Sequence, residues 1–374
     1  MQENMIGAYG AWAASLVPDA PGRYSWRNPR WADLAEWRTA ARQQVSARLA
    51  SPPLAGPPPV TLHRAFTYDG LHIEDLSWQL PYGPPTRSYL LKPAGATGAL
   101  PGVVGLHCHG GQKFFGREKI VQTDDEGYGV MPYYDGVGWA NELAKRGYVV
   151  LVHDAFAFAS RRVLLRDAPE VLRKGVVDPA WGDQAGIEAY NRWAAEHESV
   201  MAKSLFCAGT TWPGVFLAED RAALDVLCAR PDVDASRVGC GGLSGGGLRT
   251  VMLAGMDERI QCAVCVGMMT TWRDYLLHKA HTHTWMIYVP LLPNELDYPE
   301  ILGLRVPHPT LVLNDIDDPL FTLPEMQRAE QILRAVYDKA GAGDHFACSY
   351  YPGPHKFDRP MQAEAFDWFD RWLK

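Results

Sequence analysis

The stretch VGCGGLSGGG, residues 238–247, decides the prediction of the fold. The residues of its first half are small and apolar, as in a strand that is covered on both faces of a sheet. Its second half places Ser244 in the pattern G-x-S-x-G, and a helical pattern follows as far as about Met256. A serine at a sharp turn between a buried strand and a helix is the setting in which this pattern marks a nucleophile. We therefore expect Ser244 to be a nucleophile at the carboxyl end of a strand.

The neighbours of Ser244 favour the same interpretation. Glycine tolerates the strained backbone of so tight a turn, and glycines stand on both sides of this serine. The N-terminus of the following helix directs backbone N–H groups and a positive dipole end toward a developing oxyanion. The N–H of Gly245 is accordingly expected to be one oxyanion donor.

Strand and helix patterns alternate on both sides of this stretch. An antiparallel opening pair is expected at 71–80 and 86–93. Apolar runs predict further strands at 102–107, 148–154, 262–268, 309–314 and 346–352, and helices are expected at 138–147, 324–340 and 359–373. This order predicts an α/β fold with a mostly parallel central sheet and helices on both faces.

We divide the chain into two parts. Residues 1–60 form an expected helical extension that ends in the Pro-rich connector SPPLAGPPP, and residues 61–374 form the catalytic domain. An apolar stripe along 34–49 predicts a helix packed on that domain, with a contact between copies or a wall of the active site as alternatives. Residues 155–212 exceed one crossover helix and are expected to be an insertion that caps the site.

A serine nucleophile needs a base and an acid that orients the base. His355 lies in YPGPHKF, directly after the last predicted strand, which is where the base belongs. The stretch NDIDDPLF after the preceding strand offers three aspartates. We favour Asp318, because the following proline biases it toward an extended conformation; Asp317 and Asp315 remain alternatives.

A second oxyanion donor is expected from the stretch HCHGG, residues 107–111, which ends another buried strand. The backbone N–H of His109, Gly110 or Gly111 could join that of Gly245, and the sequence does not choose among them.

With these residues assigned, the chain resembles the dienelactone-hydrolase-like and acetylxylan-esterase-like branch of the α/β-hydrolase superfamily over roughly residues 70–374. The resemblance rests on LHCHGG, GLSGGG, NDIDDPLF and YPGPHKF. It aligns Asp318 with the family acid, while Asp315 and Cys108 stand where glycine is common. It implies a cofactor-free enzyme that hydrolyses esters or lactones.

Aromatic and polar residues after another strand suggest the substrate side of the site. We expect Trp272, Trp285 and His283 to wall a narrow pocket, which would suit a short acyl group joined to a compact alcohol such as a sugar or an aromatic ring. Lactone opening or C–C bond hydrolysis by the same residues is an alternative. A hydrolase fold kept as a binding module without catalysis is another.

Two patterns resemble metal or redox sites. The run HKAHTH, residues 278–283, could join His107 and His109 at a zinc ion, but its spacing does not fit one helical face and no metal is expected. Cys262 and Cys265 lie in an apolar run and are interpreted as buried thiols.

Composition indicates which classes of binding partner the protein can have. The formal net charge is −7 and no basic run occurs, so nucleic acid is not expected to bind. No stretch approaches the roughly 20 apolar residues of a membrane span, and no secretory signal is visible. The sequence thus predicts a cytoplasmic protein acting on a small-molecule ester.

Overall fold

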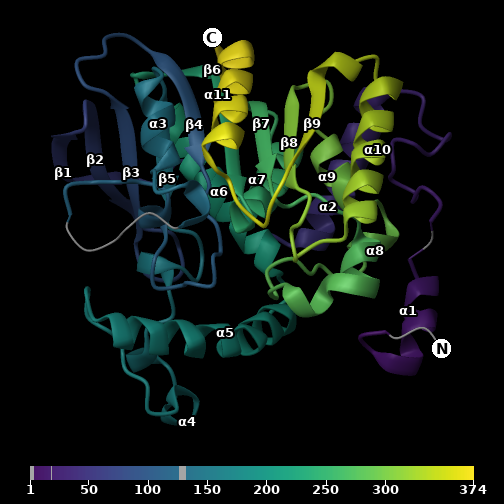
Figure 1. Cartoon of the computed structure of the whole chain (residues 1–374), viewed down its shortest axis with the longest axis horizontal. Helices are drawn as coiled ribbons and strands as arrows, with labels where there is room; N and C mark the ends of the chain where they lie inside the picture. Colours follow the sequence, from purple (N-terminus) through teal and green to yellow (C-terminus); the bar gives the residue numbers. More distant parts are fainter. Residues whose placement is uncertain (1–3, 18, 126–131) are drawn as a thin grey trace.

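A computed structural model describes residues 4–17, 19–125 and 132–374 (Figure 1). Its central feature is a nine-stranded sheet in the order β1-β2-β3-β5-β4-β6-β7-β8-β9. The pairs from β1 to β5 are antiparallel and those from β5 to β9 are parallel. The strands are β1 (Val60–Tyr68), β2 (Leu71–Trp78), β3 (Thr86–Pro93), β4 (Leu100–Gly105), β5 (Val149–His153), β6 (Val233–Leu243), β7 (Ile260–Val266), β8 (Thr310–Asp315) and β9 (Phe346–Tyr351).

Helices cover both faces of this sheet, as the sequence predicted (Figure 1). One face packs against α2 (Leu34–Leu49), α6 (Trp212–Cys228), α7 (Gly245–Met256), α9 (Tyr298–Gly303) and α10 (Leu323–Lys339). The other face packs against α3 (Trp139–Lys145) and α11 (Arg359–Leu373).

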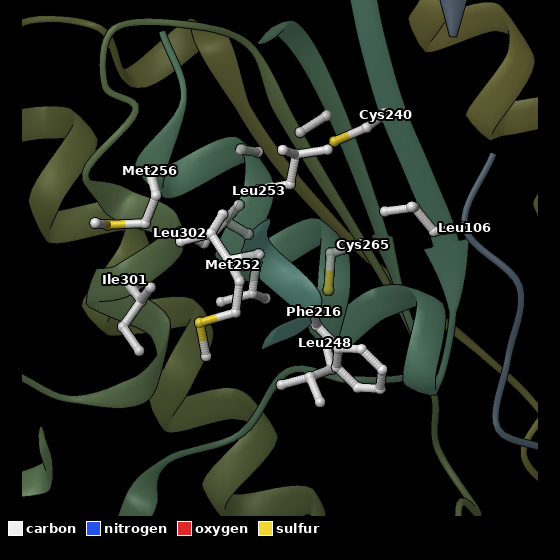
Figure 2. Packing of buried hydrophobic residues seen from close by; sticks show 14 of the residues in the cluster. Leu106, Phe216, Cys240, Leu248, Met252, Leu253, Met256, Cys265, Ile301 and Leu302 are labelled. Carbon is white, nitrogen blue, oxygen red and sulfur yellow. The ribbon is translucent and has the colours of Figure 1, made fainter. Parts of the chain in front are cut away.

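The core follows the period-two alternation of the strands. Val104 of β4 belongs to the core on the α7 side, whereas its neighbour Val103 belongs to the core on the α11 side. Figure 2 shows part of the larger core, where Leu253 of α7 lies near Cys240 of β6 and Leu248 of α7 lies near Phe216 of α6. Buried positions on both faces explain why these strands read as continuous apolar runs in the sequence.

The same alternation separates the two cysteines with metal-like spacing. Cys262 and Cys265 lie on β7 and are both buried free thiols. Cys262 faces the α11 side and Cys265 the α7 side. The prediction of ordinary buried thiols is therefore confirmed.

The N-terminal region is less helical than predicted. Helix α2 buries the expected stripe, and Arg42 on it donates hydrogen bonds to the carbonyl oxygens of Gly255 and Leu304. Before it, helical structure occurs at η1 (Gly7–Tyr9) and α1 (Gly10–Ser15). Residues 19–33 form turns rather than a helix, and Pro21 and Pro29 lie within them.

The long insertion contains α4 (Glu170–Arg173) and α5 (Gln184–Cys207), which lie apart from the sheet in Figure 1. It has a small apolar core of its own, to which Phe114 and Phe115 from the loop after β4 contribute. The insertion is thus fastened to a loop at the carboxyl edge of the sheet. No helix in the described part of the chain is long and apolar enough to cross a membrane.

Candidate active site

Ser244 occupies the turn between β6 and α7 with φ 59° and ψ −117°, a strained conformation for a residue other than glycine. Close packing around the turn explains its glycines. A Cβ on Gly242 or Gly246 would come about 2 Å from the carbonyl oxygen of Leu106. The turn therefore requires glycine at both positions and presents Ser244 at the start of α7.

His355 is held by Asp318. The Nδ1–H of the imidazole donates to Oδ2 of Asp318 over 2.6 Å. The second oxygen, Oδ1, accepts the N–H of Leu320 at 2.9 Å, so both carboxylate oxygens have partners. The ring also packs on Gly267, where a Cβ would come 2.9 Å from Cε1 of His355. Asp318 is buried, and its contacts fix the position of the imidazole.

The other two aspartates contact the loop of His355 rather than its ring. Oδ2 of Asp315 accepts the N–H of Lys356 at 2.9 Å, and Oδ2 of Asp317 accepts the N–H of Gly353 at 3.0 Å. Asp315 is fully buried, and within the described chain its Oδ1 has no hydrogen-bond partner. Burial raises the pKa of Asp315 to about 7.

Ser244 and His355 both line one cavity of about 330 Å³. Its floor includes Gly245 and the stretch 108–111. The walls are mostly apolar and are formed by Tyr133, Leu243, Leu248, Met268, Thr282, His283, Thr284, Met286, Ile287 and Leu320. No lysine or arginine of the described residues is among them.

The expected substrate residues differ in their positions. His283 lines the cavity and contacts the carbonyl oxygen of Leu320 through Nε2 at 2.9 Å. Trp272 lies in the core instead, where its indole N–H donates to the carbonyl oxygen of Leu296. Trp285 is 41 % exposed and does not line the cavity. The structure therefore brings one of these three side chains to Ser244.

Among the candidate oxyanion donors, Gly111 is already engaged, because its N–H donates to Nδ1 of His109 at 3.0 Å. Gly110 and Gly111 have φ values of 57° and 67°, which explains the glycine pair. Gly245 and His109 lie against each other, since a Cβ on Gly245 would come 2.8 Å from the backbone nitrogen of His109. His109 and Gly110 remain as upstream donors.

The imidazole of His109 has a structural contact. Because Nδ1 accepts a hydrogen bond, Nε2 carries the proton and donates to Oε1 of Glu198 at 3.1 Å. Burial lowers the pKa of His109 to about 4, which keeps the ring neutral.

Glu198 connects the insertion to the site. It lies on α5, forms a buried ion pair with Lys113, and its Oε2 accepts the N–H of Trp285 at 3.4 Å. Within the described chain no residue of 155–212 lines the cavity, so the insertion reaches the site through this carboxylate. The sequence carries no signal for this cluster.

A second histidine–aspartate pair lies elsewhere. Nε2 of His153 is 2.9 Å from Oδ1 of Asp220, and Arg249 donates to the same carboxylate. All three side chains are buried, and none lines the cavity of Ser244. This cluster is a buried ion-pair network.

The structure does not bring together the histidines that were considered as zinc ligands. Among the described residues, His278, His281 and His283 do not gather with one another, or with His107 and His109, into a three-ligand group. The group that does have metal-like spacing is Asp315, Asp318 and His355. A cation there would have to replace the hydrogen bond between His355 and Asp318.

No protein-family model matches the chain. A Bacillus subtilis (strain 168) protein, YtaP, named as a candidate hydrolase, is 27 % identical over 289 residues, which cover 76 % of this chain and 83 % of YtaP.

Solved structures match a larger share of the chain than YtaP does. A candidate acetyl xylan esterase from Bacteroides fragilis NCTC 9343 has a TM-score of 0.67 and 16 % identity, over 93 % of this chain and 83 % of its own. A glucuronoyl esterase from Solibacter usitatus has a TM-score of 0.62 and 15 % identity, over 95 % and 98 %. The chain has the α/β-hydrolase fold, and the predicted fold class is confirmed.

Proposed function

We propose that the protein is a serine esterase in which Ser244, His355 and Asp318 form the catalytic triad. The observation that carries the proposal is that the His355–Asp318 pair and the strained serine turn meet at one cavity. The names of the relatives add support, since YtaP is a candidate hydrolase and the structural neighbours are esterases.

The proposed reaction has two halves. Nε2 of His355 takes the proton of the Ser244 hydroxyl as Oγ attacks the ester carbonyl, and the protonated imidazole then gives that proton to the departing alcohol. This leaves an acyl group on Ser244. His355 next takes a proton from water, the hydroxide attacks the acyl carbonyl, and Ser244 leaves with the proton as the acid is released.

Asp318 and the backbone N–H groups have separate roles in this proposal. Asp318 holds the imidazole in the tautomer that leaves Nε2 free to accept a proton, and stabilises the charged ring. The oxyanion of each tetrahedral intermediate would be bound by the N–H of Gly245 and by that of His109 or Gly110. Both sets of groups belong to the same carboxyl edge of the sheet.

The cavity supports a short, uncharged substrate. Its volume of about 330 Å³ lies near the small end of ligand pockets, and its walls are largely apolar. Thr282, His283, Thr284, Met286 and Ile287 form one wall of it, and the insertion supports that segment through the contact of Glu198 with the N–H of Trp285. We infer an acetyl-to-butyryl ester of a compact alcohol, with Thr282, His283 and Thr284 as the polar groups.

Hydrolysis of p-nitrophenyl acetate by wild type and Ser244→Ala tests the proposal. Ser244→Ala should lower kcat by about three orders of magnitude or more, because the remaining binding groups supply little catalysis by themselves. Ser236→Ala is the control and should match wild type, because Ser236 is an exposed residue of β6 whose hydroxyl donates to Oδ1 of Asp234. A Ser244→Ala enzyme with more than a tenth of wild-type kcat would contradict it.

A further inference from the structure

Lys119 is a buried lysine behind the loop that follows β4. Its side chain is inaccessible to solvent, and its Nζ donates to the carbonyl oxygens of Cys108 at 3.0 Å and His109 at 2.8 Å. The ring of Phe158 lies 4.5 Å from the same nitrogen. Within the described chain it forms no ion pair with a carboxylate. Burial lowers its pKa to about 8, so burying this group is costly.

The two carbonyls determine the direction of two N–H groups. In a trans peptide the C=O and the next residue's N–H point in opposite directions. The carbonyl of Cys108 shares its peptide with the N–H of His109, and the carbonyl of His109 shares its peptide with that of Gly110. With both oxygens bound to Lys119, the N–H groups of His109 and Gly110 are turned away from it.

The side away from Lys119 is the side of Ser244. The backbone nitrogen of His109 lies so close to Gly245 that a Cβ there would come within 2.8 Å of it. The start of α7, directly after Ser244, therefore lies beside the N–H of His109, and Ser244, His109 and Gly110 all line one cavity. Gly111, the third upstream candidate, uses its N–H within the loop.

The turn that carries Lys119 is held by the residue that follows β5. Asp154, buried directly after β5, accepts the backbone N–H of Arg117 and its guanidinium, each at 2.9 Å. Lys119 follows two residues later in the same 3₁₀ turn, η2 (Arg117–Lys119). A Cβ on Gly116 would come 2.3 Å from Oδ1 of Asp154, so the turn fits tightly against the strand end.

We propose that Lys119 is a positioning residue of the oxyanion hole, which turns the N–H groups of His109 and Gly110 toward the tetrahedral intermediate by binding the carbonyl oxygens of Cys108 and His109. The cation also polarises both peptide groups, so that their N–H groups become stronger donors. This inference rests on the proposed function.

The test compares Lys119→Met with wild type, using ester turnover and the affinity of a trifluoromethyl ketone with a short alkyl chain. That ketone forms a tetrahedral oxyanion adduct on a serine and therefore needs the oxyanion hole. In Lys119→Met, kcat should fall about 10- to 100-fold and KM should change less than about twofold, since the oxyanion exists only after attack. The affinity for the ketone should fall by the same factor as kcat.

Lys339, an exposed residue at the end of α10, provides a control. Its Nζ also donates to backbone carbonyl oxygens, those of Trp26 and Trp31, and lies 4.2 Å from the Trp26 ring, outside the cavity. Lys339→Met should change thermal stability alone, with kcat and ketone affinity at the wild-type level. If Lys119→Met does not fold, Lys119→Gln, which retains an N–H donor, should show a smaller loss confined to kcat and ketone affinity.

Three results are decisive. Wild-type kcat and ketone affinity in a folded Lys119→Met or Lys119→Gln enzyme would overturn the role of Lys119. So would a loss that appears in KM alone. A wild-type enzyme that neither turns over the ester nor forms an adduct at Ser244 would instead overturn the proposed function, whatever the Lys119 variants do.

Discussion

Asp318 and His355 are joined by a hydrogen bond of 2.6 Å between Oδ2 and Nδ1. The bond joins two loops that follow neighbouring parallel strands, β8 and β9, at the same edge of the sheet. The carboxylate fixes the proton on Nδ1, and Nε2 therefore carries the lone pair. In the proposed mechanism this base serves Ser244, which lies on a third loop at the same edge of the sheet.

Asparagine substitutions distinguish the catalytic roles of Asp315, Asp317 and Asp318. Asp318→Asn should lower kcat by about 10³- to 10⁴-fold, because the amide favours the wrong histidine tautomer. Asp315→Asn keeps an acceptor for the N–H of Lys356 and should stay within about fivefold of wild type. Steady-state kinetics with p-nitrophenyl acetate measures both.

Asp317→Asn is the matched control, since its side chain contacts the same loop from an exposed position. It should resemble wild type. A larger loss of kcat in Asp315→Asn than in Asp318→Asn would assign the acid to Asp315 and contradict our assignment.

Asp315 should make stability depend on pH. Its pKa is raised to about 7 by burial, whereas an aspartate in an unfolded chain titrates near 4. The native state therefore binds this proton more tightly. Keeping Asp315 charged in the native state lowers the free energy of unfolding. This loss is absent below about pH 4, grows as the pH rises toward about 7, and is constant above that.

Asp315→Asn removes this titration. The free energy of unfolding of the variant relative to wild type should rise by at most about 1.4 kcal/mol per pH unit between pH 4 and 7, and then level off. Urea unfolding at pH 4.5, 6 and 8 checks the trend. A difference that is constant or shrinks as the pH rises would contradict a raised pKa of Asp315 in the native state.

Glu198 should matter for stability more than its position on an insertion suggests. Glu198→Ala leaves Lys113 buried without its carboxylate partner, and breaking a buried ion pair costs about 3–5 kcal/mol. The double variant Glu198→Met with Lys113→Met should recover part of that loss, because no buried charge then remains unpaired.

The same helix offers a control. Glu196 forms an exposed pair with Lys174, and Glu196→Ala should leave the melting temperature essentially unchanged. Calorimetric melting of the four proteins measures these effects. Equal melting temperatures for the Glu198 and Glu196 variants would show that α5 is not fastened to the site by this carboxylate.

Acyl-chain length tests the inferred shape of the cavity. Since the cavity that Ser244 lines has a volume of only about 330 Å³, kcat/KM on p-nitrophenyl esters should be highest between acetyl and butyryl and should fall steeply by octanoyl. Ile287→Ala shortens a side chain that lines the cavity and so enlarges the cavity. The variant should therefore prefer esters with longer acyl chains than wild type does. A wild-type maximum at eight carbons or beyond would refute the narrow cavity.

Much of the fold could be predicted because parallel strands buried on both faces leave continuous apolar runs, as in 262–268 and 309–314. Strand β1 was missed, since most of its side chains are exposed at the sheet edge and give no apolar pattern. The turns at 19–33 were included in the predicted helical extension, but tertiary contacts set their backbone: the indole N–H groups of Trp31 and Trp37 donate to the carbonyl oxygens of Arg23 and Tyr24.

The residues of the candidate site could be predicted where each of them follows a strand. Ser244, Asp318 and His355 each follow a strand, so topology brings their loops to one edge of the sheet. Contacts across the chain left no such signal: Glu198 meets His109 from 89 positions away, and Lys119 reaches the loop from a separate turn. Trp272 could not be distinguished from a wall residue, because core and pocket tryptophans look alike in a sequence.

The central claim is that Ser244 is the nucleophile, and labelling with a fluorophosphonate followed by peptide mass mapping tests it most directly. The probe bonds covalently to an activated serine and adds its mass to that residue. We predict one label per chain, on the peptide that contains Ser244, no label on Ser244→Ala, and much slower labelling of Asp318→Asn. Labelling of another serine, or none under conditions in which the enzyme hydrolyses p-nitrophenyl acetate, would contradict the account.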